Sequence, residues 1–186
     1  IRSVLKGRFP LLLLVVSLFS IGAFDFSFVL LRAGEAGVSE AFVPLVYAMI
    51  NVAHTIVAIP AGFLSDKIGK ERVLIIGYGT FLASALLLSV RFGGVVYAFS
   101  VAFVYGAYFG ITETVQRALI PGYVSSKLRG TAYGIYYLTV GASFLLANVA
   151  IGYLWDAFGS SVPFIYSAVA STLAIVGLAA FSRAKT

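Results

Sequence analysis

Four side chains that can exchange protons or form ion pairs interrupt long apolar stretches of the chain: Asp25, His54, Glu113 and Arg117. A charged group at the centre of a bilayer costs at least about 2.5 kcal/mol, so each of them needs a reason to be there. Asp25 lies about 22 Å into its apolar stretch if that stretch is helical. A partly desolvated carboxylate at this depth suits proton exchange. The alternative is an interfacial Asp25 paired with Arg32, two helical turns further on.

His54 is the only histidine of the chain, and Asn51 precedes it on the same helical face. A histidine near the membrane midplane that faces a water-filled cavity is a natural proton carrier. A lone histidine can equally be a hydrogen-bonded packing residue. Glu113 precedes Arg117 by four residues, the favourable order for an ion pair on one helical face. This pair is either structural or a carboxylate that exchanges Arg117 for a substrate or a proton.

Tyrosines also occur in the middle of the apolar stretches, where a hydroxyl group needs a partner. Tyrosine is normally enriched at the membrane interface, so Tyr105 and Tyr108 at mid-depth favour a polar cavity that supplies those partners. We therefore expect a substrate and proton pathway that includes Asp25, Asn51, His54, Tyr105, Tyr108, Glu113 and Arg117.

The composition defines the class of protein that must position these side chains. Of the 186 residues, 61% are apolar and 11% charged, and the mean hydropathy is +1.03. Soluble domains average roughly 45–50% apolar and about 25% charged residues. These values exclude a soluble enzyme, a nucleic-acid binder and a disordered chain, and they indicate an all-α protein embedded in a lipid bilayer. Without cysteine, a second histidine or a phosphate-binding glycine loop, we expect no metal, no cofactor and no enzymatic activity.

Apolar runs bounded by charged or turn residues predict six transmembrane helices in one bundle over residues 1–186. They cover residues 10–31, 41–65, 73–90, 95–120, 130–155 and 162–181. The third and sixth lack charge, which predicts peripheral helices that face lipid. The chain begins with Ile1 rather than methionine, so we expect an upstream part of the protein to precede it.

The basic residues lie almost entirely on one side of this predicted bundle. Six spans place eleven Lys and Arg residues on one side, and only Arg32 and Arg91 on the other. Basic loops are retained in the cytoplasm. The sequence therefore predicts a plasma-membrane protein with both termini cytoplasmic.

A short motif occurs twice, ninety residues apart. Gly62-x-x-x-Asp66-x-x-Gly69 follows the second span, and Gly152-x-x-x-Asp156-x-x-Gly159 ends the fifth. Three helices separate the two copies, so they have opposite orientations in the membrane. This arrangement predicts two inverted three-helix repeats, as inside transporter bundles.

The loop Gly62-x-x-x-Asp66-Lys67-x-Gly69-Lys70-x-Arg72 resembles the signature loop of the major facilitator superfamily. The segments 129–134 and 152–159 also resemble the second half of that superfamily, and with residues 25–32 the resemblance covers nearly the whole chain. The resemblance implies the C-terminal six-helix half of a twelve-helix transporter. It also implies that this loop is a cytoplasmic gate that holds the two halves together.

The chemistry of the loop is consistent with that role. Gly62 allows a neighbouring helix to approach closely, and Gly69 permits the tight reversal into the next span. Asp66 can accept hydrogen bonds from the N-terminus of an adjacent helix. Lys67, Lys70 and Arg72 can pair with acidic side chains or lipid phosphates. The alternative is a basic turn that does no more than obey the positive-inside rule.

Together these features predict half of a secondary active transporter that moves a small solute by alternating access, with protons as the coupling ion. The abundance of Phe and Tyr favours a hydrophobic or amphipathic solute, although lipid-facing rings would look the same. Its expected partners are the lipid bilayer and either another six-helix half or a second copy. The alternative function is a non-transporting membrane scaffold, an accessory subunit or an inactive part of a longer chain.

Overall fold

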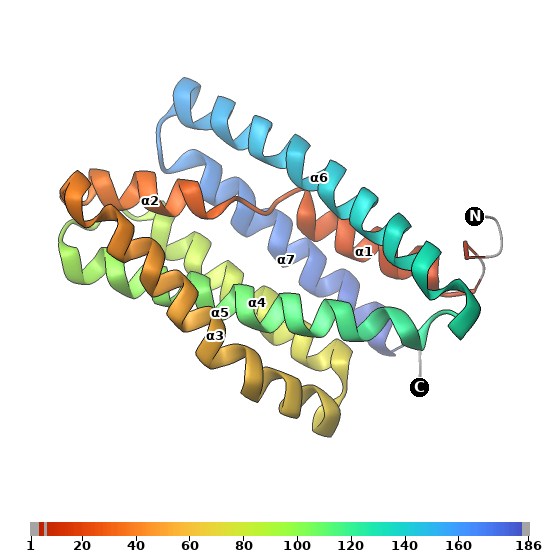
Figure 1. Cartoon of the computed structure of the whole chain (residues 1–186). Helices are drawn as coiled ribbons and strands as arrows, with labels where there is room; N and C mark the ends of the chain where they lie inside the picture. Colours follow the sequence, from red (N-terminus) through yellow and green to blue (C-terminus); the bar gives the residue numbers. More distant parts are fainter. Residues whose placement is uncertain (1–3, 6, 184–186) are drawn as a thin grey trace.

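The computed structural model describes residues 4–5 and 7–183, and these residues form an all-helical bundle (Figure 1). The α-helices are α1 (Phe9–Ser20), α2 (Phe26–Glu35), α3 (Val43–Ile68), α4 (Lys70–Ser89), α5 (Val95–Leu119), α6 (Arg129–Phe158) and α7 (Val162–Arg183). Short 3-10 turns occupy Glu40–Phe42, Ile120–Gly122 and Ser126–Leu128 in the connections.

Five of these helices, α3 to α7, are long and apolar enough to cross a membrane. They overlap the second to sixth spans expected from the sequence. The first expected span, residues 10–31, is wrong as a single helix: α1 ends at Ser20 and α2 begins at Phe26. Hydropathy reports only that a segment is apolar, and it contains no information on whether the backbone stays helical through it.

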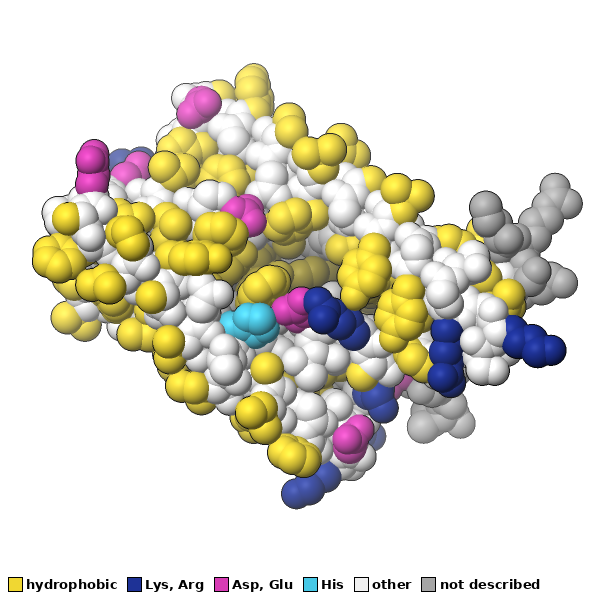
Figure 2. Space-filling model, in the orientation of Figure 1, with side chains coloured by type: hydrophobic (Ala, Val, Ile, Leu, Met, Phe, Trp, Pro, Cys, Tyr) yellow, Lys and Arg dark blue, Asp and Glu magenta, His cyan; other side chains and the backbone are white. Residues whose placement is uncertain are grey.

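The basic side chains gather at one end of the bundle (Figures 1 and 2). The start of α1, the end of α7, the α3–α4 connection and the α5–α6 connection all lie there. The described basic residues toward this end are Arg8, Lys67, Lys70, Arg72, Arg117, Lys127, Arg129 and Arg183. Arg32 and Arg91 lie toward the opposite end, while Arg2, Lys6 and Lys185 fall outside the described residues. The arrangement of the helices thus keeps the charge asymmetry that the sequence predicted.

The helices α4 and α7 pack closely against their neighbours on one face. α4 packs against both α5 and α7, and α7 also contacts α1. A larger share of α4 and α7 is buried than of α3 and α6. Both helices also carry exposed apolar side chains, such as Leu86 of α4 and Val176 of α7, and the expectation that they face lipid stays a prediction. Small side chains such as Gly77, Ser84 and Ser171 allow this close packing, and a search for charged residues does not detect them.

The helices α3 and α6 present the most exposed apolar surface. Their outward side chains are each at least 51% exposed, and they include Leu45, Val52, Ile56, Ile59 and Phe63 of α3 and Leu138, Leu145, Leu146, Val149 and Tyr153 of α6. Figure 2 shows a hollow between these two helices, with polar side chains at its centre. This hollow is where the candidate site lies.

Candidate functional site

A close crossing of α3 and α5 positions the centre of the site. Gly106 and Gly110 of α5 form a G-x-x-x-G pair, and both face the backbone of α3. A Cβ atom built on Gly106 would come within 2.3 Å of the Ile50 carbonyl oxygen, and one on Gly110 within 2.5 Å of the His54 carbonyl oxygen. Any larger residue would therefore push the two helices apart. The pair was not singled out in the sequence, although its spacing in an apolar helix is a recognisable signal.

This crossing brings His54 of α3 against Glu113 of α5 and so forms a three-residue ionic cluster. The His54 Nε2 atom lies 3.1 Å from Glu113 Oε2, and Arg117 Nη2 contacts the other carboxylate oxygen, Oε1. The His54 and Glu113 side chains are 26% and 30% exposed, and Arg117 is 58% exposed. The sequence predicted the Glu113–Arg117 pair and a polar role for His54 separately. Only the fold joins them, in the hollow of Figure 2.

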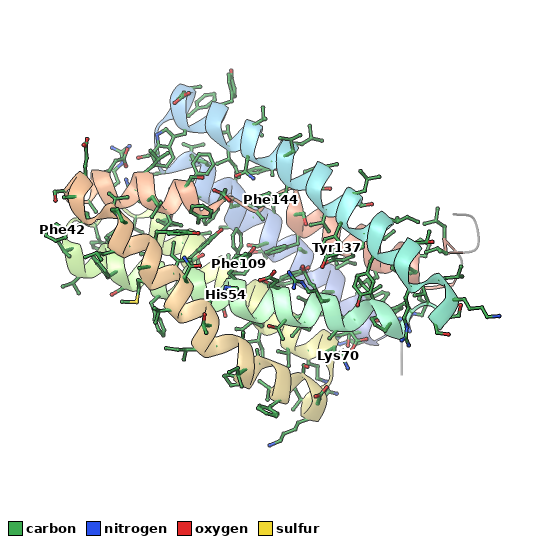
Figure 3. The ribbon with its side chains drawn as sticks, in the orientation of Figure 1. Phe42, His54, Lys70, Phe109, Tyr137 and Phe144 are labelled. Atoms are coloured by element: carbon green, nitrogen blue, oxygen red, sulfur yellow. The ribbon has the colours of Figure 1, made fainter. Side chains whose placement is uncertain are left out.

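A cavity of about 200 Å³ adjoins the cluster. Helices α1, α5 and α6 line it through side chains that include Ser20, Tyr108, Phe109, Glu113, Gln116 and Phe144. Figure 3 shows Phe109 and Phe144 in the space between α5 and α6, with His54 close to Phe109. The ring centroids of His54 and Phe109 are 4.8 Å apart. The cavity is therefore an aromatic chamber with a carboxylate and an amide on its wall.

The other sequence candidates near mid-depth are more dispersed. Tyr108 lines the cavity, but Tyr105 is buried beside it and its hydroxyl donates to the Phe24 carbonyl oxygen at 2.9 Å. Asn51 lies on an exposed face of α3, and its amide donates to the Tyr47 carbonyl oxygen. Tyr105 thus has a structural contact, and Asn51 is bonded within its own helix.

Asp25 caps the second part of the broken first span. Its carboxylate accepts hydrogen bonds from the backbone N–H and the hydroxyl of Ser27, so it starts α2 as an N-cap residue. It does not pair with Arg32. That guanidinium contacts Glu35, the Ser160 hydroxyl at 3.2 Å and the Val90 carbonyl oxygen at 3.1 Å. The alternative of an Asp25–Arg32 pair is therefore wrong.

The break between α1 and α2 is held by neighbouring helices. Interrupting a helix inside a membrane frees backbone groups that need partners. The Tyr166 hydroxyl donates to the Ile21 carbonyl oxygen at 2.7 Å, and the Asp25 N–H donates to Asn148 Oδ1 at 2.8 Å. Gly22 at the break also lets Ala170 of α7 approach, since a Cβ there would lie 2.2 Å from the alanine Cβ. Asn148 was missed in the sequence; its amide within an apolar span was the available signal.

A second polar network lies beside the cavity and was also missed. Gln116 Nε2 donates to the Tyr78 hydroxyl at 3.2 Å, and the Tyr136 hydroxyl donates to Gln116 Oε1 at 2.8 Å. The network links α4, α5 and α6 one turn from Glu113. It anchors the α5 segment that holds the ionic cluster.

The loop between α3 and α4 reverses the chain at Gly69. This glycine has φ 97° and ψ 143°, a region open essentially only to glycine, and its N–H donates to the Ser65 carbonyl oxygen. Lys70 Nζ lies 3.7 Å from Asp66 Oδ1, whereas Lys67 and Arg72 are exposed. A Cβ atom built on Gly62 would lie 3.7 Å from Thr114 Cγ2 of α5, an ordinary contact, so this position does not require glycine for close helix packing.

Beside this loop, Glu71 at the start of α4 accepts a 2.7 Å hydrogen bond from the Tyr123 hydroxyl. Burial, followed by this bond, raises the pKa of Tyr123 above its usual value. The contact ties the α3–α4 loop to the α5–α6 connection, so the two basic connections at this end of the bundle are joined through a buried acidic residue.

Residues 11–186 of the chain match the Major Facilitator Superfamily. The chain belongs to this superfamily. An uncharacterised superfamily transporter of Methanocaldococcus jannaschii is 30% identical, and the match covers 89% of this chain and 42% of that protein. An uncharacterised protein of Mycobacterium bovis is 29% identical over 63% of this chain and 28% of its own length.

Solved transporters of known fold have the same helix arrangement as this superfamily member. A crystal structure of a peptide transporter in complex with sulfate superposes with a TM-score of 0.71 at 20% identity, covering 94% of this chain and 39% of that one. Tetrameric PepTSo2 superposes with a TM-score of 0.72 at 16% identity, covering 95% and 41%. The match therefore spans about two fifths of the Methanocaldococcus jannaschii transporter and of both solved structures.

Proposed function

We propose that the chain forms one half, the C-terminal one, of a secondary active transporter that moves a small solute by alternating access with protons as the coupling ion. The observation that supports this most strongly is the His54–Glu113–Arg117 cluster on the open face of the bundle. Charged groups in an apolar span are costly and mark ion or proton pathways. A scaffold has no need of such a cluster beside an aromatic cavity.

The cluster offers a simple coupling step. While Glu113 is ionised, it binds Arg117 on its own helix and His54 on α3. A proton on Glu113 weakens its hold on both partners, and Arg117 is exposed enough to swing toward a solute. Because His54 and Glu113 lie on different helices, the protonation state biases how α3 and α5 sit against each other.

The open faces of α3 and α6 support the proposal of a missing half. A polar hollow cannot face lipid, since its unpaired groups would each cost several kcal/mol. We propose that six further helices cover this hollow, from the same polypeptide or from a second copy. The proportion of the relatives' length that this chain matches agrees with the first arrangement.

The contacts between helices support two inverted repeats, with α1 and α2 together acting as one span. The packing of α3 on α5 has a counterpart in α6 on α1, and α4 on α5 has a counterpart in α7 on α1. The third helix of each repeat, α4 and α7, pack against one another, as expected near a two-fold axis. When α1 and α2 are counted as one span, the chain crosses the membrane six times. Both termini then lie on the basic side of the bundle, which we propose is the cytoplasmic side of the cell membrane. The loop from Gly62 to Arg72 is then the cytoplasmic gate.

The proposal is tested by uptake in proteoliposomes that contain the complete polypeptide to which this chain belongs. A mixture of radiolabelled small metabolites is offered with and without an imposed pH gradient. We expect a solute to accumulate only with the gradient, and a protonophore to abolish its accumulation. Glu113→Gln should lose gradient-driven accumulation and retain exchange of the same solute at equal pH, because only the proton site is removed.

The matched control is Glu40→Gln, which changes an exposed carboxylate in the α2–α3 connection. This variant should accumulate solute as the parent protein does. If Glu113→Gln and the parent respond equally to the gradient, the cluster does not couple protons and this proposal fails.

A further inference from the structure

We propose that the cavity beside Asp25 binds the positively charged head of an amphipathic organic cation, whose apolar part packs on the surrounding rings. This inference rests on the proposed function, because it names the substrate class of that transporter. It follows from the charge of Asp25 next to the cavity and from the rings that line the cavity.

The negative charge of Asp25 has no cationic partner. Among residues 4–5 and 7–183, no Lys, Arg or His nitrogen within 4.0 Å forms an ion pair with its carboxylate. Its hydrogen bonds come from Ser27 alone, and these are neutral donors. No cationic side chain of the described residues therefore balances this carboxylate.

Glu113, the carboxylate that lines the cavity, is already paired with a cation. Glu113 is bound to Arg117 and faces His54. The remaining helices around the chamber add no charge at this depth: α1 contains none, and the charged residues of α6, Arg129 and Asp156, lie in its end turns. Asp25 is therefore the carboxylate next to the cavity that has no basic partner among the described residues, and a monovalent cation would balance it.

Aromatic rings line the cavity next to the Asp25 segment. Ala23, two residues before Asp25, lines the same cavity as Phe19, Tyr108, Phe109 and Phe144. Asn148, which binds the Asp25 N–H, is one turn beyond Phe144 on α6. Figure 3 shows Phe109 and Phe144 in this space. Ring faces attract a cation that has left water, so the rings can bind both the head and the apolar part of the ligand.

The test uses benzyltrimethylammonium, a permanent cation, and its neutral isostere neopentylbenzene. Equilibrium dialysis measures the binding of each to the complete polypeptide in detergent. We expect the cation to bind more tightly than the isostere. Asp25→Asn should weaken cation binding at least about tenfold, because it removes a partly desolvated charge pair. It should leave the isostere unchanged. Asparagine caps helices about as well as aspartate, so this variant should fold.

A second variant and a control variant test whether the rings and the Asp25 charge cause the binding of the cation. Phe144→Leu should weaken cation binding by about fivefold through loss of a ring face. Asp156→Asn removes an exposed carboxylate at the far end of α6 and should change nothing. Equal binding of the cation and its isostere, or cation binding unaffected by Asp25→Asn, would overturn the inference.

Binding needs no transport cycle, which separates this test from that of the proposed function. Gradient-driven uptake without charge-dependent binding would overturn only the cation site. Charge-dependent binding at Asp25 without gradient-driven uptake would support the site and overturn only the proton coupling.

Discussion

The turn after α3 and the turn after α6 have nearly the same backbone but very different surroundings. Gly69 has φ 97° and ψ 143°, and Gly159 has φ 89° and ψ 163°. Each glycine N–H donates to the carbonyl oxygen four residues earlier, in Ser65 at 3.2 Å and in Trp155 at 3.0 Å. The repeated motif therefore specifies one backbone conformation at both ends of the bundle.

The charges around the two turns differ in origin and burial. At the α3 turn, the basic side chains belong to the loop itself and are largely exposed, and the Lys70–Asp66 contact is long. At the α6 turn, the positive charge comes from elsewhere: Arg32 of α2 is 3% exposed and binds Ser160 beside Gly159. The motif determines the chain reversal at both turns. The buried charge of Arg32 stabilises the fold at the α6 turn, whereas the exposed charges at the α3 turn stay available for a partner.

The largest expected effect is the loss of the buried guanidinium. Arg32→Met should lower the free energy of unfolding by about 2 kcal/mol, because the buried Ser160 hydroxyl loses the guanidinium as a charged hydrogen-bond partner. Lys70→Met at the other turn should cost below about 0.5 kcal/mol, as for an exposed ion pair. Unfolding by SDS in mixed micelles measures both. Equal losses would show that the two turns do not differ in this way.

The two glycines should respond alike if the turns share one conformation. Gly69→Ala and Gly159→Ala should each cost about 1–2 kcal/mol, because the positive φ angle strains any residue with a Cβ. Gly141→Ala, in open space within α6, is the control and should be neutral or slightly stabilising. The same unfolding assay applies. A large cost at only one turn would mean that the repeat does not preserve the backbone.

The smallest effect on stability, and a selective one on transport, is expected at the two aspartates. Asp66→Asn should slow solute uptake by the complete transporter with little change in stability, because its carboxylate is 76% exposed and pairs only loosely with Lys70. Asp156→Asn should leave uptake unchanged. Initial uptake rates at equal expression distinguish the two. Equal rates for both variants would favour the simpler interpretation of a basic turn.

Local patterns account for what the sequence could predict. Five long helices, the basic end of the bundle and the Glu113–Arg117 pair follow from hydropathy, loop charge and an i, i+4 spacing. The loop motif also led to the superfamily, which the family match confirms. Each of these depends on residues close together along the chain, where helical geometry alone sets the distances.

The tertiary structure decided the features that depend on contacts across helices. The sequence predicted His54 near the midplane and Glu113 near the inner end of its span, but only the close approach of α3 to α5 at Gly106 and Gly110 joins them. The break at Asp25 likewise exists because Tyr105, Asn148 and Tyr166 supply partners for its backbone. A helix interruption in lipid is stable only when neighbouring helices satisfy the freed N–H and C=O groups. Hydropathy sums single residues and contains no term for those neighbours, so the sequence determined which groups enter the membrane and the fold determined which of them meet.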